Sequence, residues 1–372
     1  MRPEMLFENA EETAGQPSIA ELCGLAATGL AQMFDAERQL FCNTYARTAA
    51  GMERVGCSRR YTLMTLLGLH RHELKGGSSP VPTSQVLQNL MVDTRWIDGA
   101  GDLGLLLWTC AELLPAHLPD VYSQVRADEA LARFQDGQQG CTMEVAWYLT
   151  GLVACYEAGH PDLPGLPEQL AAARQILIGN RGTGGIYGHL NRRSRLAGYL
   201  RGGIGSFADQ VYPTIAFARL SQALQDREAQ ELATRTATTM CNLQGTCGEW
   251  SWLYGSLNGR VISRYPVYSV HQHAMGPMML FAAGDASGSD FSTAIAKSLA
   301  WISGDNELHH NFIEPSLGLV WRSIYFEPMN QYTDAAMRFL RLRDGAATVQ
   351  RKIRYECRPY ELGWLLYAFA GK

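Results

Sequence analysis

The chain has 372 residues, of which 47% are hydrophobic and 18% are charged, and this composition excludes a disordered or low-complexity protein. The formal net charge of −4 provides no basic field for a nucleic-acid backbone, so no nucleic-acid partner is expected. The nine cysteines are odd in number and contain no CxxC pair, which disfavours a disulfide framework and a zinc ribbon.

The N-terminal segment and the apolar runs carry no targeting or membrane signal. Residues 1–15 are acidic and lack the apolar core of a signal peptide. The longest apolar run, around Leu103 to Trp108, is far below the roughly 20 residues that a membrane span needs. We therefore expect a cytoplasmic protein with no membrane span, in which residues 1–19 form a flexible leader and residues 20–372 form a single domain.

Six segments of the chain carry apolar and aromatic residues on nearly all sides of a predicted helix. Helices of this kind belong in the interior, whereas one-sided amphipathic helices belong on the surface. The six interior helices are predicted to begin, in chain order, at Arg59, Asp102, Met143, Ala208, Val270 and Pro359. Alanine-rich amphipathic helices are predicted between them at 167–177, 227–243 and 291–302.

The interior helices repeat along the chain. Glu144, Asp209 and His271 stand at equivalent positions in three of them, with a period of about 60 to 65 residues. A repeat unit of this kind buries its apolar face only against its neighbours. The pattern predicts an all-α fold, an (α/α)6 toroid in which six inner helices alternate with outer helices around a central cavity.

Long connections rich in glycine and aromatic residues follow the later outer helices, at 179–206, 244–269 and 303–331. Loops of more than about 12 to 15 residues are usually functional or disordered, and the aromatic content argues against disorder. We expect these connections to fold over one mouth of the ring. Asn258-Gly259 is a hairpin signal, so short β-ribbons are predicted within them.

One of these connections carries the pattern Gln244-xxx-Gly248-x-Trp250, directly after a predicted outer helix. It resembles the QxxxGxW element of terpenoid cyclases and prenyltransferase-like toroids, which joins an outer helix to the next inner helix. The resemblance implies the toroid fold of that superfamily. The DxDD motif of protonation-initiated cyclases and the DDxxD-like motif of the metal-dependent classes are both missing here, so cyclisation by the standard acid is not implied.

The stretch from Cys241 to Met278 also resembles a group of bacterial toroid-type proteins without an assigned function. In that group, the positions of Leu253, Gly255 and His273 carry His, Asp and Asp. The resemblance implies that a family site has been altered in this chain. This alteration favours a scaffold or binding protein that keeps the ring without its chemistry.

The N-terminal ends of the inner helices meet at one mouth of a toroid, so their polar residues are expected close together. Asp209 and Glu144 are the candidate general acids, because burial among aromatic groups raises the pKa of a carboxyl group into a useful range. His271 is the candidate base, and Tyr212 completes the candidate catalytic group. The alternative is structural, because acidic residues near a helix start also cap the helix and complement its dipole.

Aromatic, arginine and polar residues near this mouth are the candidates for substrate binding. Arginine binds a carboxylate or a phosphate, or else stacks on an aromatic ring. The candidates are Tyr61, Asp102, Trp250, Trp252, Tyr265, Tyr268, Gln272, His273, Arg264, Trp321 and Arg322. Helix positions separated by one residue, such as His271 and His273, point apart, so no metal and no cofactor is expected.

Three functions are compatible with this sequence. The first is a terpenoid-cyclase-like cyclase or isomerase of bacterial natural-product biosynthesis, which holds an apolar isoprenoid or polyene in the cavity and moves protons with a carboxyl group and a histidine. The second is a carbohydrate-active enzyme, namely a lyase, an epimerase or a glycoside hydrolase, because α/α toroids also host these chemistries. The third is a toroid scaffold or binding protein without activity. We expect an enzyme acting on a small molecule and place the first function ahead, on the basis of fold analogy.

Overall fold

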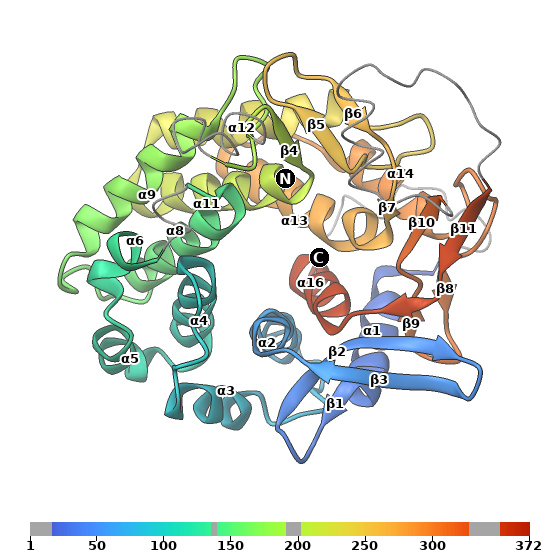
Figure 1. Cartoon of the computed structure of the whole chain (residues 1–372), viewed down its shortest axis with the longest axis horizontal. Helices are drawn as coiled ribbons and strands as arrows, with labels where there is room; N and C mark the ends of the chain where they lie inside the picture. The colour runs from blue at the N-terminus through green and yellow to red at the C-terminus, as the bar shows by residue number, and fades with distance from the viewer. Residues whose placement is uncertain (1–16, 135–139, 191–201, 327–349) are drawn as a thin grey trace.

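Two concentric sets of helices make up the computed structural model of the chain, which describes residues 17–134, 140–190, 202–326 and 350–372 (Figure 1). The inner helices are α2 (Arg59–Leu74), α4 (Ala100–Leu113), α8 (Thr142–Glu157), α11 (Ala208–Leu224), α13 (Gly276–Ser287) with the π-helical turn His271–Met275 before it, and α16 (Pro359–Phe369). The outer helices are α1 (Ile19–Met33), α3 (Thr83–Val92), α5 (Leu118–Gln124), α9 (Leu166–Asn180), α12 (Arg227–Asn242) and α14 (Ser292–Ile302). The short helix α6 (Ala130–Arg133) lies between α5 and α8 in the chain.

The inner helices form a closed ring. Each inner helix contacts the next one along the chain, and α16 contacts α2 (Figure 1). Outer helices pack behind them: α1 lies against α16, α9 against α8, and α12 against α11 and α13. The predicted all-α (α/α)6 toroid is thus confirmed. Each predicted inner helix begins within two residues of an observed one, when the fifth is counted from its π-helical turn.

The burial of each helix follows its residue pattern. Every residue of α8 from Val145 to Cys155 is buried, because this helix touches neighbours on all sides. The outer helix α12 buries Ala229, Ala233 and Ala237, which are spaced by four residues and therefore lie on one face. The difference between all-round and one-sided burial is what separates the inner ring from the outer ring.

Aromatic side chains fill the middle of the ring. The Trp364 ring stacks on Trp108 with 5.7 Å between centroids, and its Nε1 donates a hydrogen bond to the Tyr212 hydroxyl over 3.1 Å. Tyr212 in turn meets the Trp147 ring edge-on at 5.0 Å. All four side chains are buried. We call Trp108, Trp147, Tyr212 and Trp364 the aromatic layer, and it separates the two ends of the ring.

Helices α4 and α8 approach each other closely at Gly104 and Gly151. A Cβ atom at Gly104 would collide with backbone atoms of Trp147 and Tyr148. Gly104→Ala is therefore expected to push the helices apart and to lower the free energy of unfolding by about 1–3 kcal/mol, the usual cost of overpacking. Urea unfolding measures this change. Gly179→Ala on α9, where a Cβ meets nothing within 4 Å, is the control and is expected to be neutral or stabilising; equal stability of both variants would contradict the close approach.

Small antiparallel sheets decorate the ring. The predicted hairpin around Asn258-Gly259 is confirmed, because β5 (Leu253–Gly255) pairs with β6 (Val261–Ser263) across it. The other short strands are β4 (Ile204–Ser206), which pairs with β5, β7 (Val267–Tyr268) and β11 (Arg351–Arg354), which flank β10 (Ser323–Phe326), and the pair β8 (Ile313–Glu314) and β9 (Leu319–Val320).

The sequence pattern does not predict the longest strands. β2 (Leu40–Thr48) and β3 (Gly51–Cys57) form a hairpin, and β1 (Phe34–Asp35) and β12 (Glu356–Cys357) also pair with β2. The side chains of β3 are mostly exposed. This strand therefore lacks the alternation of apolar and polar residues by which a half-buried strand is recognised.

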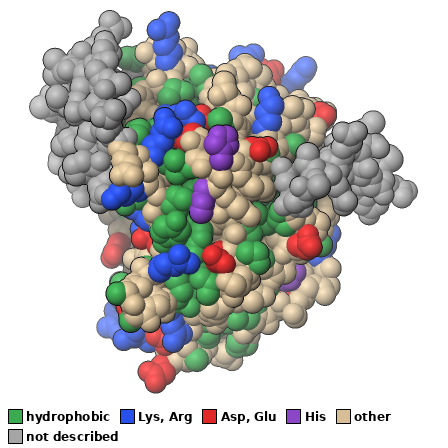
Figure 2. Space-filling model, turned by 90° about the vertical axis from the view of Figure 1, so that its right-hand side faces the viewer, with side chains coloured by type: hydrophobic (Ala, Val, Ile, Leu, Met, Phe, Trp, Pro, Cys, Tyr) green, Lys and Arg blue, Asp and Glu red, His purple; other side chains and the backbone are tan. Residues whose placement is uncertain are grey.

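Figure 2 shows the side of the molecule that carries several of these strands. Basic and acidic side chains are interspersed there with apolar ones, so this face presents no single-sign charged surface. Among the described helices, none combines the length and the apolar character that crossing a bilayer requires.

Candidate functional site

The inner helices run in the same direction, because each outer helix returns the chain to the side from which it started. Their first turns therefore meet at one end of the ring, which we call the N-terminal mouth. The polar residues of these turns include Arg60, Asp102, Glu144, Asp209, His271 and Glu361. Three of the four candidate catalytic residues, Asp209, His271 and Glu144, belong to this set.

Arg60 links two carboxylates at the N-terminal mouth. Its Nε donates to Asp102 Oδ1 over 2.6 Å and its Nη1 donates to Glu144 Oε1 over 2.9 Å. Burial lowers the pKa of Arg60, but the hydrogen bond with Asp102 and the charge of Glu144 outweigh it and raise the pKa overall, so the guanidinium stays charged. It also lies over the Trp147 ring at 5.2 Å. Gly101 leaves room for this cluster, because a Cβ there would collide with the Glu144 carboxylate.

His189 and Asp209 form a second polar group at this mouth. His189 Nδ1 donates to Asp209 Oδ2 over 3.1 Å, and the same oxygen accepts hydrogen bonds of 2.8 Å from the Ser206 backbone N–H and hydroxyl. The Asp209 side chain is fully buried, whereas the His189 side chain is 25% exposed. Asp209 thus orients the imidazole and fixes its tautomer without itself facing solvent. A histidine held in this way is arranged for acid–base catalysis.

His271 lies in the π-helical turn that precedes α13. Its ring centroid is 4.6 Å from that of Phe207 and 5.2 Å from that of Tyr268. Burial, followed by the charge of Arg322, lowers the pKa of His271 to about 3. The ring is therefore neutral near pH 7 and is a weak base. The assignment of His271 as the catalytic base stays a prediction.

His273 in the same turn is fully buried, and within the described residues neither ring nitrogen has a hydrogen-bond partner. Burial lowers its pKa from 6.5 to about 3 in the folded chain. Below pH 6.5 the unfolded state therefore binds a proton that the folded state does not, and the stability is expected to fall as the pH drops toward 3, by up to about 1.4 kcal/mol per pH unit. In His273→Leu this loss is absent. Urea unfolding at pH 8 and pH 5 is expected to show the variant gaining relative to wild type at pH 5; an unchanged difference would contradict a neutral buried His273.

Arg322 belongs to a buried ion-pair network at the N-terminal mouth. It pairs with Glu361, and its Nε lies 3.2 Å from Glu356 Oε1. The Arg322 side chain is 7% exposed and that of Glu361 is fully buried. The guanidinium also lies over the Tyr268 ring at 5.0 Å. The charge of Arg322 is thus already matched by two carboxylates of its own chain.

One arginine and two tyrosines form a partly exposed wall beside Arg60. Arg358 Nη1 donates to the Tyr61 hydroxyl over 2.8 Å, and the Tyr61 and Tyr360 rings lie 4.6 Å apart. The Arg358 side chain is 26% exposed. Aromatic rings and a guanidinium beside a charged cluster provide both an apolar face and hydrogen-bond donors.

The Gln244-xxx-Gly248-x-Trp250 element ties the connection after α12 to the outer helix α14. The Gln244 side-chain amide donates to the carbonyl oxygens of Gly248 over 2.8 Å and Ala294 over 2.9 Å. Trp250 is fully buried, and its Nε1 donates to the Ser298 hydroxyl over 3.0 Å. Ala294 and Ser298 both belong to α14. The element is therefore a structural part of the ring in this chain.

Two further candidates are buried in the packing below the mouth. Gln272 accepts a hydrogen bond from the Trp250 backbone N–H over 3.1 Å and donates to the Tyr268 carbonyl over 3.0 Å. Tyr212 belongs to the aromatic layer, and burial raises the pKa of its phenol well above the usual range. At neutral pH this phenol keeps its proton.

The remaining candidates lie in the loops around the mouth. Arg264 pairs with Glu249 over 2.8 Å and with Glu307 over 3.5 Å, and the Tyr265 hydroxyl donates to Glu307 over 2.6 Å. Trp321 is buried and Trp252 is half-buried. The structure thus gathers Tyr61, Asp102, Tyr268 and Arg322 with the candidate catalytic residues of the first turns, and these roles stay predictions.

His189 and Arg358 are mouth residues that the sequence pattern did not single out. His189 lies in the connection 179–206, which precedes α11 as 244–269 precedes α13, so its place in the repeat is a usable signal. Parts of these connections, 191–201 and 327–331, lie outside the described residues. Within the described ranges, no three side chains of His, Cys, Asp or Glu are grouped closely enough to hold a metal ion.

Comparison with known proteins reveals similarity of fold without similarity of sequence. No protein family and no curated protein matches the chain. A possible member of the GH105 family from Salmonella enterica serovar Paratyphi A aligns with a TM-score of 0.64 and 12% identity over 98% of this chain and 96% of that one. Cellobiose 2-epimerase from Bacillus thermoamylovorans aligns with a TM-score of 0.63 and 10% identity, over 95% and 98% of the two chains. An unsaturated glucuronyl hydrolase specific for heparin aligns with a TM-score of 0.56 and 13% identity, over 95% and 96%.

At 10–13% identity these similarities show the fold alone. They agree with the toroid that the helix pattern predicts. They lend no support to the terpenoid-cyclase part of the resemblance or to a place in natural-product biosynthesis. The chain therefore has the α/α-toroid architecture found in GH88- and GH105-type hydrolases and in a cellobiose epimerase.

Proposed function

We propose that this chain is a carbohydrate-active enzyme that transfers protons to and from a sugar at the N-terminal mouth. The observation that carries the proposal is the partly exposed His189, held by the fully buried Asp209 at the mouth where Arg60, Asp102 and Glu144 also meet. The similar structures that act on carbohydrates support this substrate class over an isoprenoid. The alternative interpretation of the sequence, a carbohydrate-active toroid, thus replaces the cyclase as the favoured one.

The residues of the mouth divide into three roles. His189 is the proton-transferring group, and Asp209 positions it. Arg60 and Arg358 are the charged donors available to sugar oxygens, since both side chains are partly exposed. The rings of Tyr61 and Tyr360 supply an apolar face for the sugar ring.

The geometry favours proton transfer at carbon, as in an epimerase, over hydrolysis by two carboxylates. Glycoside hydrolysis of the usual kind needs one carboxyl as acid and a second as base or nucleophile. Asp102 and Glu144 both pair with the same guanidinium of Arg60, so both carboxylates are held by a partner within the chain. His189, in contrast, is a single group that can both accept and return a proton.

The test uses two sugars chosen for the two reactions. Cellobiose in deuterated water is followed by NMR for deuterium at C2 and for the epimerised product, and an unsaturated glucuronyl disaccharide is followed by loss of its double-bond absorbance. We expect turnover of cellobiose or of another reducing disaccharide with deuterium incorporation. Loss of the double bond instead would support hydrolysis. A protein that leaves both sugars unchanged and binds neither, but binds farnesyl diphosphate, would overturn the proposal.

A further inference from the structure

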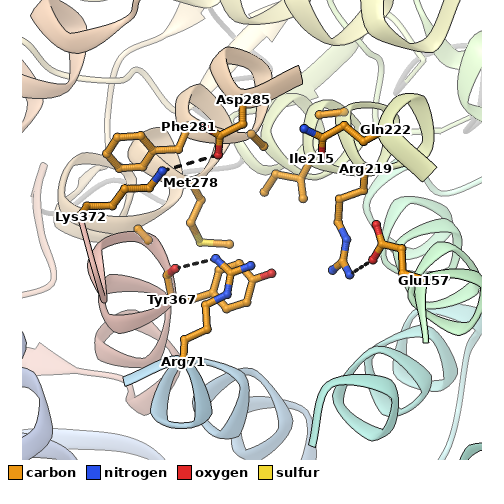
Figure 3. A pocket seen from close by; sticks show the side chains of 13 residues that line it. Arg71, Glu157, Ile215, Arg219, Gln222, Met278, Phe281, Asp285, Tyr367 and Lys372 are labelled. Atoms are coloured by element: carbon orange, nitrogen blue, oxygen red, sulfur yellow. Dashed lines mark hydrogen bonds and ion pairs between the residues drawn. The ribbon is translucent and has the colours of Figure 1, made fainter. Parts of the chain in front are cut away.

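The end of the ring opposite the N-terminal mouth carries a cavity. Residues of the inner helices α2, α8, α11, α13 and α16 surround a space of about 290 Å³, close to the lower end of the range for small-molecule sites (Figure 3). Its wall is mixed: Arg71, Arg219 and Lys372 contribute positive charge, and Ile215, Met278 and Phe281 contribute apolar surface. A space of this size suits a small ligand with one charged group.

Two of the three cations already have carboxylate partners. Arg219 pairs with Glu157 and, over 3.2 Å, with Glu112, and its guanidinium lies 5.3 Å from the centroid of a buried tryptophan ring. Lys372 Nζ lies 3.6 Å from Asp285 Oδ2. Neither cation therefore carries an unmatched charge toward the cavity.

Arg71 differs from the other two. Its guanidinium lies 3.5 Å from the centroid of the Tyr367 ring, and Nη1 donates to the Tyr367 carbonyl over 3.1 Å. Within the described residues it has no carboxylate partner. Since a guanidinium carries five N–H donors, most of its donors remain for another acceptor. Figure 3 shows the Arg71 side chain extending into the cavity from α2.

This cavity is separate from the N-terminal mouth. The aromatic layer lies between them. The Arg60 guanidinium packs on the Trp147 ring on the side of the mouth, and the Arg219 guanidinium packs on the Trp108 ring on the side of the cavity. Trp364 contacts both Tyr212 and Trp108, so the layer is continuous, and these rings are buried. A ligand in the cavity therefore does not reach His189.

We propose that this cavity is a second ligand site, which binds a small organic carboxylate. The carboxylate pairs with Arg71, and the body of the acid lies against Met278, Phe281 and Ile215. A charged hydrogen bond gives the site its preference for an anion, and the apolar wall gives its preference for an organic acid over an inorganic ion. The site is independent of the proposed sugar chemistry.

Benzoate is the probe for this site, with benzamide as its neutral counterpart. Isothermal titration calorimetry on the full chain is expected to show one benzoate bound, with benzamide at least about tenfold weaker. Arg71→Gln is expected to weaken benzoate at least about tenfold, whereas Arg95→Gln, at a 90% exposed arginine outside the cavity, is expected to leave it unchanged. Gln222→Glu, at an exposed position of the cavity wall, adds a negative charge and is expected to weaken benzoate even if Arg71→Gln fails to fold.

Several outcomes would overturn this site. If benzoate does not bind, or if it binds Arg71→Gln and Gln222→Glu as tightly as wild type, the cavity is not a carboxylate site. Complete displacement by equimolar inorganic phosphate removes the preference for an organic acid. Displacement by cellobiose, or loss of binding in His189→Gln, would place benzoate at the N-terminal mouth instead. If the protein shows no activity on sugars but still binds benzoate through Arg71, only the proposed sugar chemistry is refuted and this site stands.

Discussion

His189→Gln is expected to lower kcat on the sugar substrate by about 10²- to 10⁴-fold, the usual contribution of a positioned acid–base group. Glutamine keeps a similar reach and hydrogen-bonding capacity but cannot take up the proton. The side chain is partly exposed, so the midpoint of thermal unfolding is expected to change little. Steady-state kinetics with substrate from the assay above measures the effect. His117→Gln, at an exposed histidine outside the mouth, is the matched control and is expected to keep full activity.

Asp209→Asn tests whether the carboxylate acts through the histidine. The amide no longer fixes the tautomer that donates from Nδ1, so kcat is expected to fall about 10²-fold or more while KM stays near the wild-type value. The same variant separates catalysis from helix capping, because a purely structural Asp209 would lower stability without lowering the activity of the folded enzyme. If His189→Gln retained full kcat, the assignment of the proton-transferring group would be wrong.

Arg322→Met is expected to lower the free energy of unfolding by about 3–5 kcal/mol. The substitution leaves Glu361 fully buried with its arginine partner removed, and an uncompensated buried charge is far more costly than the pair itself. Urea unfolding measures the loss. The double variant Arg322→Met/Glu361→Gln removes both charges and is expected to recover a large part of it.

The same pair of variants decides what Arg322 does at the mouth. If Arg322 clamps a substrate, as its place among the sequence candidates suggests, Arg322→Met raises KM and leaves stability nearly unchanged. If the ion pair with Glu361 is its role, stability falls and the KM of the folded enzyme stays close to wild type. A stability loss below about 1 kcal/mol would contradict the structural role.

The helices that form the ring are predictable because their signal is local. An inner helix is apolar on nearly every side, as α8 is from Val145 to Cys155, and an outer helix such as α12 buries one face. The hairpin at Asn258-Gly259 is likewise predictable from the two residues of its turn. The β2 and β3 hairpin has no such signal. The mostly exposed β3 is a strand because it pairs with β2, and its own residues show no alternation of apolar and polar side chains.

The candidate site is only partly predictable. The repeat correctly brings Asp102, Glu144, Asp209 and His271 to one mouth, because residues at equivalent positions of parallel helices share an end of the ring. It does not show that His189, in a connection between helices, reaches Asp209. Nor does it show that Arg322 is matched by Glu356 and Glu361, from a segment more than 30 residues later in the chain.

The sequence by itself determined the ring of helices, the direction of the inner helices and the mouth at which their polar first turns meet, because apolar periodicity and repeat spacing are properties of the local chain. The tertiary structure alone decided which of these polar groups is exposed and which is paired with a neighbouring side chain. Burial and pairing depend on segments distant in sequence: Asp209 pairs with His189 from the connection before α11, and Arg71 donates to the carbonyl of Tyr367 from the other end of the chain. Chemistry at either end of the ring depends on those contacts, which no periodic pattern encodes.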